Sequence, residues 1–139
     1  MKRKKYGGIA IDLNMVDEEI IIFVDGVKVA KATFMFDGPM LRITDVRTDD
    51  IYQLQGYGRL MFSMLKTVAR QHKMPIYVWA LDDAIPFYEK IGLLHLNNPD
   101  VQKKIIFANI KDKDIPNEVD EDDFVWLPKG LRGRPLIYL

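Results

Sequence analysis

Two glycines separate an extended stretch from a helical one in the segment Gln53-Leu-Gln-Gly-Tyr-Gly-Arg-Leu-Met. The first turn of a helix leaves its N–H groups without intrahelical partners, and the helix dipole adds partial positive charge there. Glycines let the backbone approach a ligand closely and adopt angles that other residues avoid. The segment therefore predicts a phosphate cradle of backbone N–H groups, in which Gly56 and Gly58 matter more than the neighbouring side chains.

Other phosphate-binding motifs fit this segment poorly. A Walker loop needs Gly-Lys-Ser/Thr, which is absent, and a Rossmann fingerprint needs a third glycine where Met61 stands. On the turn alone, a glycine-rich helix start with no ligand stays open as the alternative.

The residues before the turn predict an antiparallel meander of strands. Asp25-Gly26 lies between two β-branched runs and indicates a hairpin, and Asp37-Gly38-Pro39 indicates a second turn. Ile9 to Met15 and Leu41 to Val46 are further strands, whereas Lys2 to Lys5 is expected to be a solvated arm. After Asp25-Gly26 two sets of residues alternate and predict a half-buried strand: Val27, Val29 and Lys31 against Lys28, Ala30 and Ala32.

The residues after the turn change to helical spacing. From Gly58 the apolar positions predict a helix that ends near Lys73, before Met74-Pro75. A strand over Ile76 to Ala80 follows, and then a second helix over Ala84 to Ile91. Asp82-Asp83 is expected to cap the second helix and Gly92 to end it. Three further strands are predicted, over Lys103 to Ile110, Phe124 to Leu127 and Pro135 to Leu139.

Composition limits the class of protein. A chain of 139 residues, 48% hydrophobic, predicts one domain over residues 1–139 with its own core. Twenty basic and twenty acidic side chains argue against a surface that tracks nucleic acid. The absence of cysteine removes disulfides and thiolate ligands, so we expect no metal site and a reducing compartment. No apolar run approaches a membrane span or a signal peptide, which together predict a cytoplasmic protein without membrane contact.

The motifs resemble those of the GNAT acetyltransferases. Gln53 to Gly58 matches the Gln/Arg-x-x-Gly-x-Gly/Ala motif of that superfamily, and Ala84-Ile-Pro-Phe-Tyr-Glu-Lys-Ile-Gly-Leu is similar to its Ala-x-x-x-Tyr-x-Lys-x-Gly-Phe segment. The resemblance covers roughly Met40 to Leu96. It implies an α+β (mixed α/β) fold with a central mixed, mostly antiparallel sheet, two splayed parallel strands and flanking helices.

The resemblance also implies a cosubstrate and a reaction. The acetyl group of acetyl-coenzyme A passes directly to a primary amine, the pantetheine arm lies along the strand before the turn, and the pyrophosphate sits on the turn. The expected coenzyme-binding residues are Val46, Arg47, Thr48, Gln53, Leu54, Gln55, Gly56, Tyr57, Gly58, Arg59, Leu60 and Tyr88.

Two catalytic residues follow from the same resemblance. Tyr88 matches the tyrosine that protonates the leaving thiolate, and a phenol suits that role because thiols and phenols have similar ordinary pKa values. Asp45 is the candidate general base, with Asp49 second. A core tyrosine and a solvated strand end are the alternative interpretations. His72, at a helix end, and His95 are the other bases by chemistry, both interpreted as structural.

The sequence departs from the family pattern near its start. Family members carry two helices between their first two strands, but here only Asn14 to Glu18 is available. We therefore expect a reduced N-terminal helical part and an acceptor side that is remodelled or completed by a second chain, as in a homodimer. The alternative function is a non-catalytic acyl-coenzyme A-binding or protein-interaction module on the same scaffold.

Overall fold

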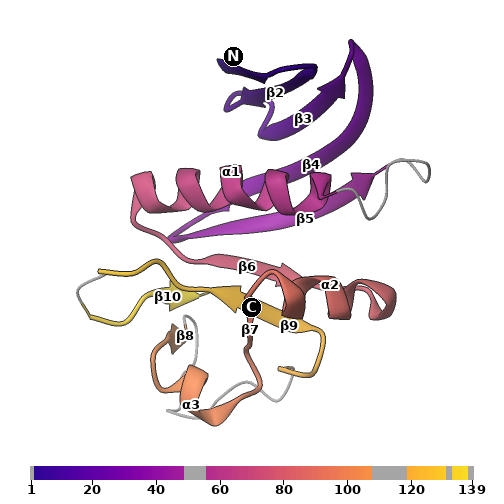
Figure 1. Ribbon diagram of the computed structural model, residues 1–139. Coiled ribbons are helices and arrows are strands. Elements are labelled where there is room, and N and C mark those ends of the chain that lie inside the picture. The colour runs from indigo at the N-terminus through magenta and orange to yellow at the C-terminus, as the bar shows by residue number, and fades with distance from the viewer. Residues whose placement is uncertain (1, 49–55, 108–118, 131–132, 138–139) are drawn as a thin grey trace. The chain divides into compact units, whose positions relative to one another are not determined.

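The computed structural model describes residues 2–48, 56–107, 119–130 and 133–137 (Figure 1). Contacts divide the chain into two compact units, Met1–Met35 with Ile43–Val68, and Phe36–Arg42 with Ala69–Leu139. The single domain predicted over residues 1–139 stays a prediction.

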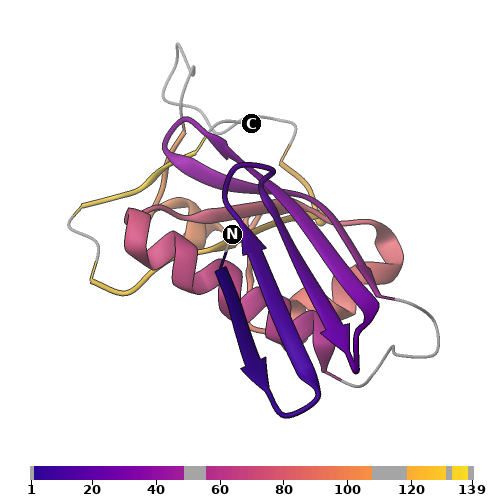
Figure 2. The same ribbon diagram turned by 90° about the horizontal axis from the view of Figure 1, so that it is seen from above.

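The first unit is built on an antiparallel meander, as the turn signals predicted. Its strands lie side by side in chain order, as Figure 2 shows for the first four. They are β1 (Lys2–Tyr6), β2 (Ile9–Asn14), β3 (Glu19–Val24), β4 (Val27–Asp37) and β5 (Met40–Thr48), of which β4 and β5 continue into the second unit.

The solvated arm predicted at the start of the chain is wrong, because Lys2 to Tyr6 forms strand β1. A turn with Gly7 at φ +62° returns the chain, so that Lys2 pairs with Leu13 and Tyr6 with Ile9. β1 is the first strand in the sheet order, so one backbone edge of β1 has no neighbouring strand among the described residues. A run of cations on such an edge discourages association with other strands. The missed signal was Gly7-Gly8, a turn signal directly before the predicted strand Ile9 to Met15.

An ion pair between an exposed arginine and a buried carboxylate joins β1 to β2. Asp12 is a buried carboxylate, and Arg3 donates to its two oxygens from Nε and Nη2 at 2.5 and 2.7 Å. These bonds hold the pKa of Asp12 below its ordinary value. The pair satisfies a charge that burial alone would destabilise.

The β2–β3 connection confirms the reduced N-terminal helical part. Residues 15–18 form a turn, in which the side-chain oxygen of Asn14 accepts hydrogen bonds from the N–H groups of Val16 and Asp17, both at 3.0 Å. Glu18 completes the turn in the left-handed region at φ 54°. An Asx turn of this kind leaves no room for a helix between the two strands.

The helix predicted from Gly58 is α1 (Tyr57–His72), which begins one residue earlier and ends one residue before Lys73. It ends where Lys73 adopts φ 53° and donates from its N–H to the carbonyl of Arg70 at 3.1 Å. One face of α1 is buried and consists of Met61, Phe62, Leu65, Val68 and Ala69.

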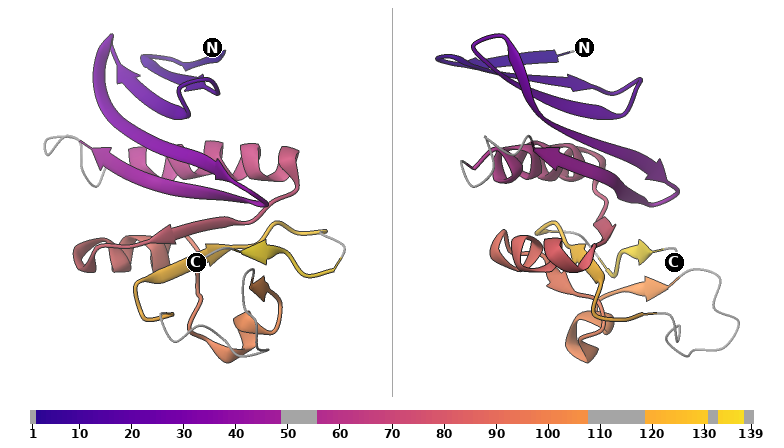
Figure 3. Two further views of the ribbon diagram at one scale, coloured as in Figure 1. Left: turned by 180° about the vertical axis from the view of Figure 1, so that it is seen from behind. Right: turned by 90° about the vertical axis from the view of Figure 1, so that its right-hand side faces the viewer.

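In the second unit, β9 (Asp123–Trp126) lies between β6 (Ile76–Trp79) and β7 (Leu94–His95), antiparallel to both (Figure 3). The predicted parallel pair starts where Leu41, near the beginning of β5, donates from its N–H to the carbonyl of Pro75, just before β6, at 2.9 Å. Mixed and mostly antiparallel pairing was therefore predicted correctly.

Short elements complete the second unit. The second predicted helix is η2 (Asp82–Ala84) followed by α2 (Ile85–Lys90), and neither acidic side chain at its start forms a cap bond, so the capping prediction is wrong. The strand predicted over Lys103 to Ile110 is shorter, because α3 (Pro99–Gln102) precedes it and β8 covers Ile106–Phe107; residues 108–110 lie outside the described part. β8 pairs in parallel with β10 (Leu136–Ile137). The core consists of Met40, Tyr77, Leu96, Val101, Ile105, Val125 and Ile137.

One polar pair sits inside that core. The buried hydroxyl of Tyr77 donates to the carboxylate of Asp123, whose other oxygen accepts from the N–H of Asp120 at 2.9 Å. Arg42 lies over the Tyr77 ring at 4.9 Å and bonds Asp37 at 2.9 Å. Burial first, and then the bond to Asp123, raises the pKa of Tyr77 above its ordinary value.

The Arg3–Asp12 pair generates a stability prediction. Arg3→Met leaves a buried carboxylate without its cation, so the free energy of unfolding should fall at pH 7 by clearly more than for an exposed cation of the same strand. Lys5→Met, an exposed cation on the same strand, is the control and should change it by less than about 0.5 kcal/mol. Urea denaturation measures both, and equal effects would contradict the role of the pair.

Tyr77 generates a prediction at alkaline pH. Its folded pKa is raised, so the unfolded phenol loses its proton first, near pH 10, and the free energy of unfolding falls above that pH. Tyr77→Phe should be less stable at pH 7 by about 1–3 kcal/mol, because Asp123 loses its donor. The variant should also lose less stability than the parent chain between pH 8 and pH 11. Parallel pH profiles would show that Tyr77 does not titrate in this way.

Candidate functional site

The predicted phosphate cradle is a helix start preceded by a glycine with positive φ. Gly56 has φ +86°, which favours glycine, and a side chain beginning there would meet no atom within 4 Å. Leu60 donates from its N–H to the Gly56 carbonyl at 3.0 Å, the first hydrogen bond of α1. The N–H groups of Gly58 and Arg59 therefore precede the helical bonding pattern, next to open space around Gly56.

The charge at this helix start suits an anion. The first turn of α1 contains no acidic side chain, and Arg59 is exposed there. The dipole of this 16-residue helix is equivalent to roughly half an elementary positive charge at the N-terminus. Gln53, Leu54 and Gln55, the rest of the predicted cradle, lie outside the described residues, as does Asp49.

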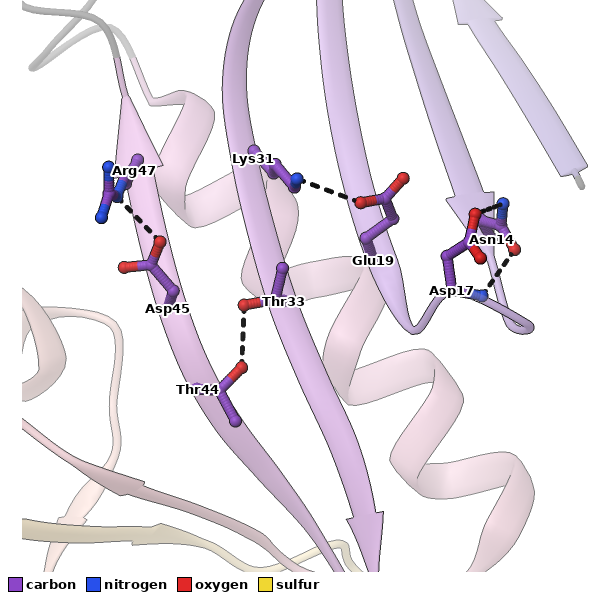
Figure 4. Close-up of polar contacts among 8 residues, drawn as sticks. All are labelled: Asn14, Asp17, Glu19, Lys31, Thr33, Thr44, Asp45 and Arg47. Carbon is purple, nitrogen blue, oxygen red and sulfur yellow. Dashed lines mark hydrogen bonds and ion pairs between the residues drawn. The ribbon is translucent and has the colours of Figure 1, made fainter.

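The predicted pantetheine strand is the end of β5. Val46 is half-buried there, Arg47 has a side chain 82% exposed, and Thr48 is the last residue of the strand. Arg47 Nε donates to Asp45 Oδ2 at 2.8 Å (Figure 4). The same figure shows the hydroxyls of Thr33 and Thr44 joining β4 to β5 at 2.8 Å.

The candidate base is therefore exposed and paired. The side chain of Asp45 is 49% exposed, and its carboxylate accepts a hydrogen bond from a guanidinium. An exposed ion pair of this kind contributes little to stability. The carboxylate remains free to exchange Arg47 for another cation.

The candidate acid lies in the other unit. Tyr88 is a buried residue of α2, and its ring lies 5.7 Å from that of Phe124 and 5.3 Å from that of Phe87. Gly92 and the Leu93 N–H, which donates to the Tyr88 carbonyl at 3.1 Å, close the helix after it. The sequence motif thus brings the tyrosine into a packed aromatic group.

Both histidines have structural partners. His95 Nε2 lies 2.9 Å from Glu89 Oε2, and its ring lies 4.6 Å from that of Phe124. His72, at the end of α1, contacts the Phe36 ring at 4.9 Å. These contacts agree with the structural interpretation of both residues.

The sequence pattern missed one feature beside Asp45. A pocket of about 310 Å³ in the first unit is lined by Lys28, Val29, Ala30, Lys31, Thr33, Asp45 and Arg47. Strict alternation placed Val29 opposite Ala30, but both are buried, because β4 carries an irregularity there. No residue type in this stretch announces such an irregularity.

Within the part of the chain that the structure describes, no helix has the length and apolar character needed to cross a membrane. In that same part, no cluster of three or more histidine, aspartate or glutamate side chains is arranged to hold a metal ion.

Comparison with known proteins identifies the family. The model of the acetyltransferase (GNAT) family matches residues 9–93, which is more than half of the chain. The chain therefore belongs to the GNAT acetyltransferase family, whose chemistry is acyl transfer from acyl-coenzyme A. The match begins at β2, earlier than the resemblance noted from the motifs, and β1 lies outside the matched residues. A comparison with curated proteins found no significant match.

Solved structures share the fold. The N-acetyltransferase YlbP of Bacillus subtilis in complex with coenzyme A is 20% identical, with 81% of this chain and 68% of that chain covered at a TM-score of 0.55. The GNAT family N-acetyltransferase YhbS of Escherichia coli, also in complex with coenzyme A, is 12% identical, with 86% and 65% covered at 0.58. Ard1 of Thermoplasma volcanium is 18% identical, with 63% and 66% covered at 0.53. This chain thus spans about two thirds of the length of each.

Proposed function

We propose that this chain is an N-acetyltransferase that moves an acetyl group from acetyl-coenzyme A directly to a primary amine. The observation that carries the proposal is the helix start at Gly56, with φ +86° and open space, inside the segment that the family model matches. The coenzyme A complexes of YlbP and YhbS support the choice of cosubstrate.

The residues present fit the coenzyme. The N–H groups of Gly56, Gly58 and Arg59 would hold its diphosphate, with the predicted Gln53, Leu54 and Gln55 before them; the Leu60 N–H already donates to the Gly56 carbonyl. The end of β5, Val46 to Thr48, would hold the pantetheine arm through backbone groups, as adjacent strands hold each other. Arg59, exposed beside the cradle, adds a cation for a phosphate oxygen.

Acyl-coenzyme A supplies an activated thioester, so that a carbon–nitrogen bond forms as the carbon–sulfur bond breaks. In this proposal a carboxylate oxygen of Asp45 takes the proton that the acceptor ammonium must lose. The Tyr88 hydroxyl donates a proton to the departing sulfur, and the second proton that the nitrogen loses as the amide forms restores the phenol. The proton taken by Asp45 passes to solvent, so each turnover releases one proton.

The proposal also covers the cellular location and the oligomeric state of the protein. A cysteine-free chain supports a cytoplasmic location. The short Asx turn at Asn14, where family members carry helices, supports an acceptor side that differs from theirs, and a homodimer that completes it stays a prediction.

The cradle can be tested with a pair of matched glycines. Gly26, at φ +82° in the β3–β4 hairpin, has the same open surroundings as Gly56. Gly56→Glu and Gly26→Glu therefore introduce similar backbone strain and the same charge, but only the first adds a carboxylate at the diphosphate site. Thermal shift with coenzyme A at saturating concentration measures the outcome.

We expect stabilisation of the parent chain and of Gly26→Glu, and none for Gly56→Glu. Failure of coenzyme A to stabilise the parent chain would refute the proposal. Equal stabilisation of the two variants would show that the diphosphate binds elsewhere on the molecule.

The acid role of Tyr88 has a kinetic signature. Tyr88→Phe keeps the buried ring but removes the proton donor, so kcat should fall by about 100-fold while the KM for acetyl-coenzyme A changes little. Thermal shift of Tyr88→Phe with coenzyme A is the control and should equal that of the parent chain. An unchanged kcat in Tyr88→Phe contradicts the role, and coenzyme binding without turnover of any amine by the parent chain would favour the non-catalytic module.

A further inference from the structure

A β-bulge shapes one edge of the pocket beside Asp45. Ile22 of β3 pairs with Ala30, but the next residue, Phe23, pairs with Lys28, so that Val29 is an extra residue on β4. Val29 and Ala30 are consecutive, yet both are buried, with 1% and 4% of their surface exposed. Bulges bend a strand and redirect its side chains in this way.

The bulge brings two lysines to the same side of β4. In a regular strand, residues three apart point to opposite faces. Here Lys28 is exposed and the Lys31 side chain is 39% exposed, while the bulged residues between them are buried. Both lysines therefore line the pocket, at one end of which the Thr33 hydroxyl contacts Thr44.

The charged side chains that line the pocket differ in whether they form ion pairs. Lys31 Nζ lies 3.2 Å from Glu19 Oε2, and Arg47 is paired with Asp45 (Figure 4). Among the described residues Lys28 forms no ion pair, so the pocket and its partners carry one excess positive charge. That excess favours a ligand with an anionic group.

The Asp45–Arg47 pair adds a second requirement. A ligand that took Asp45 with an ammonium alone would leave the Arg47 guanidinium without its partner. A ligand with both an ammonium and an anionic group can exchange with the pair, because its ammonium replaces Arg47 at Asp45 and its anion pairs with Arg47 and Lys28.

The size of the pocket sets the separation of the two charges. Asp45 and Arg47 are two residues apart on β5, roughly 7 Å along a strand, and Lys28 lines the same pocket from β4. The volume of about 310 Å³ is that of a small-molecule site. An acceptor whose amine and anion are several carbon atoms apart suits this placement of the charges.

We propose that the acceptor of this acetyltransferase is a primary amine that also carries an anionic group, with the amine at Asp45 and the anion at Lys28 and Arg47. This inference rests on the proposed function for the reaction, but not for the binding preference. The amine is acetylated as described above, and the anionic group takes no part in bond making.

The test compares three probes of equal chain length: 6-aminohexanoate, 6-aminohexyl phosphate and hexylamine. We expect kcat/KM for an anionic probe to exceed that for hexylamine by about fivefold or more, mainly through KM. Lys28→Gln should reduce this preference by about threefold, and Lys28→Glu should abolish it. Lys5→Gln, an exposed cation on β1, is the control and should keep the preference.

Isothermal titration calorimetry of the three probes on the free protein separates the inference from the proposed function. Tighter binding of an anionic probe, lost in Lys28→Glu, supports the inference even when no acyl transfer is detected. Equal binding and equal kcat/KM for all three probes would overturn it, and so would a loss in Lys28→Gln that is the same for hexylamine. A preference for the carboxylate over the phosphate, or the reverse, identifies the anion.

Discussion

Backbone N–H groups at the start of α1 are the constraint on which the account of this protein depends. A helix cannot satisfy the N–H groups of its own first turn, and these groups need water, a cap or a ligand. At Gly56 the chain adopts φ +86°, and a Cβ at that residue would meet no atom within 4 Å. The residue that would offer a capping side chain in many proteins is here a glycine with none. In our proposal the diphosphate of coenzyme A accepts hydrogen bonds from these N–H groups.

Other elements of the first unit carry further parts of the proposed site. Strand β5 leads toward it and carries Asp45 and Arg47 in its last residues. The resemblance to the family predicts helices between the first strands, but here an Asx turn at Asn14 joins β2 directly to β3. The bulge at Val29 instead gives the β4–β5 surface a pocket with its own charges. An acceptor site made of strand side chains would bind a narrow range of acceptors, because strands fix the spacing of their charged side chains.

Much of this could be predicted from the sequence, and the rest could not for definite reasons. Asp25-Gly26 predicted the β3–β4 hairpin because its turn needs positive φ, and Asp25 and Gly26 adopt it. The change of period at Gly58 located α1 to within one residue. Strand β1 was missed because Lys2 to Lys5 looks like a solvated arm until its pairing with β2 and the buried Asp12 are known. The bulge at Val29 was missed because alternation is a local rule, whereas the register is set by the partner strand.

The central claim is that coenzyme A binds at the first backbone N–H groups of α1. The most direct measurement is a titration of the ¹⁵N-labelled protein with coenzyme A, followed by amide chemical shifts. The account predicts that the largest shifts fall on Gly56, Gly58 and Arg59, with smaller changes along Val46 to Thr48. Saturable binding with the largest shifts on β7 and β9, and unmoved amides at Gly56 to Arg59, would contradict it.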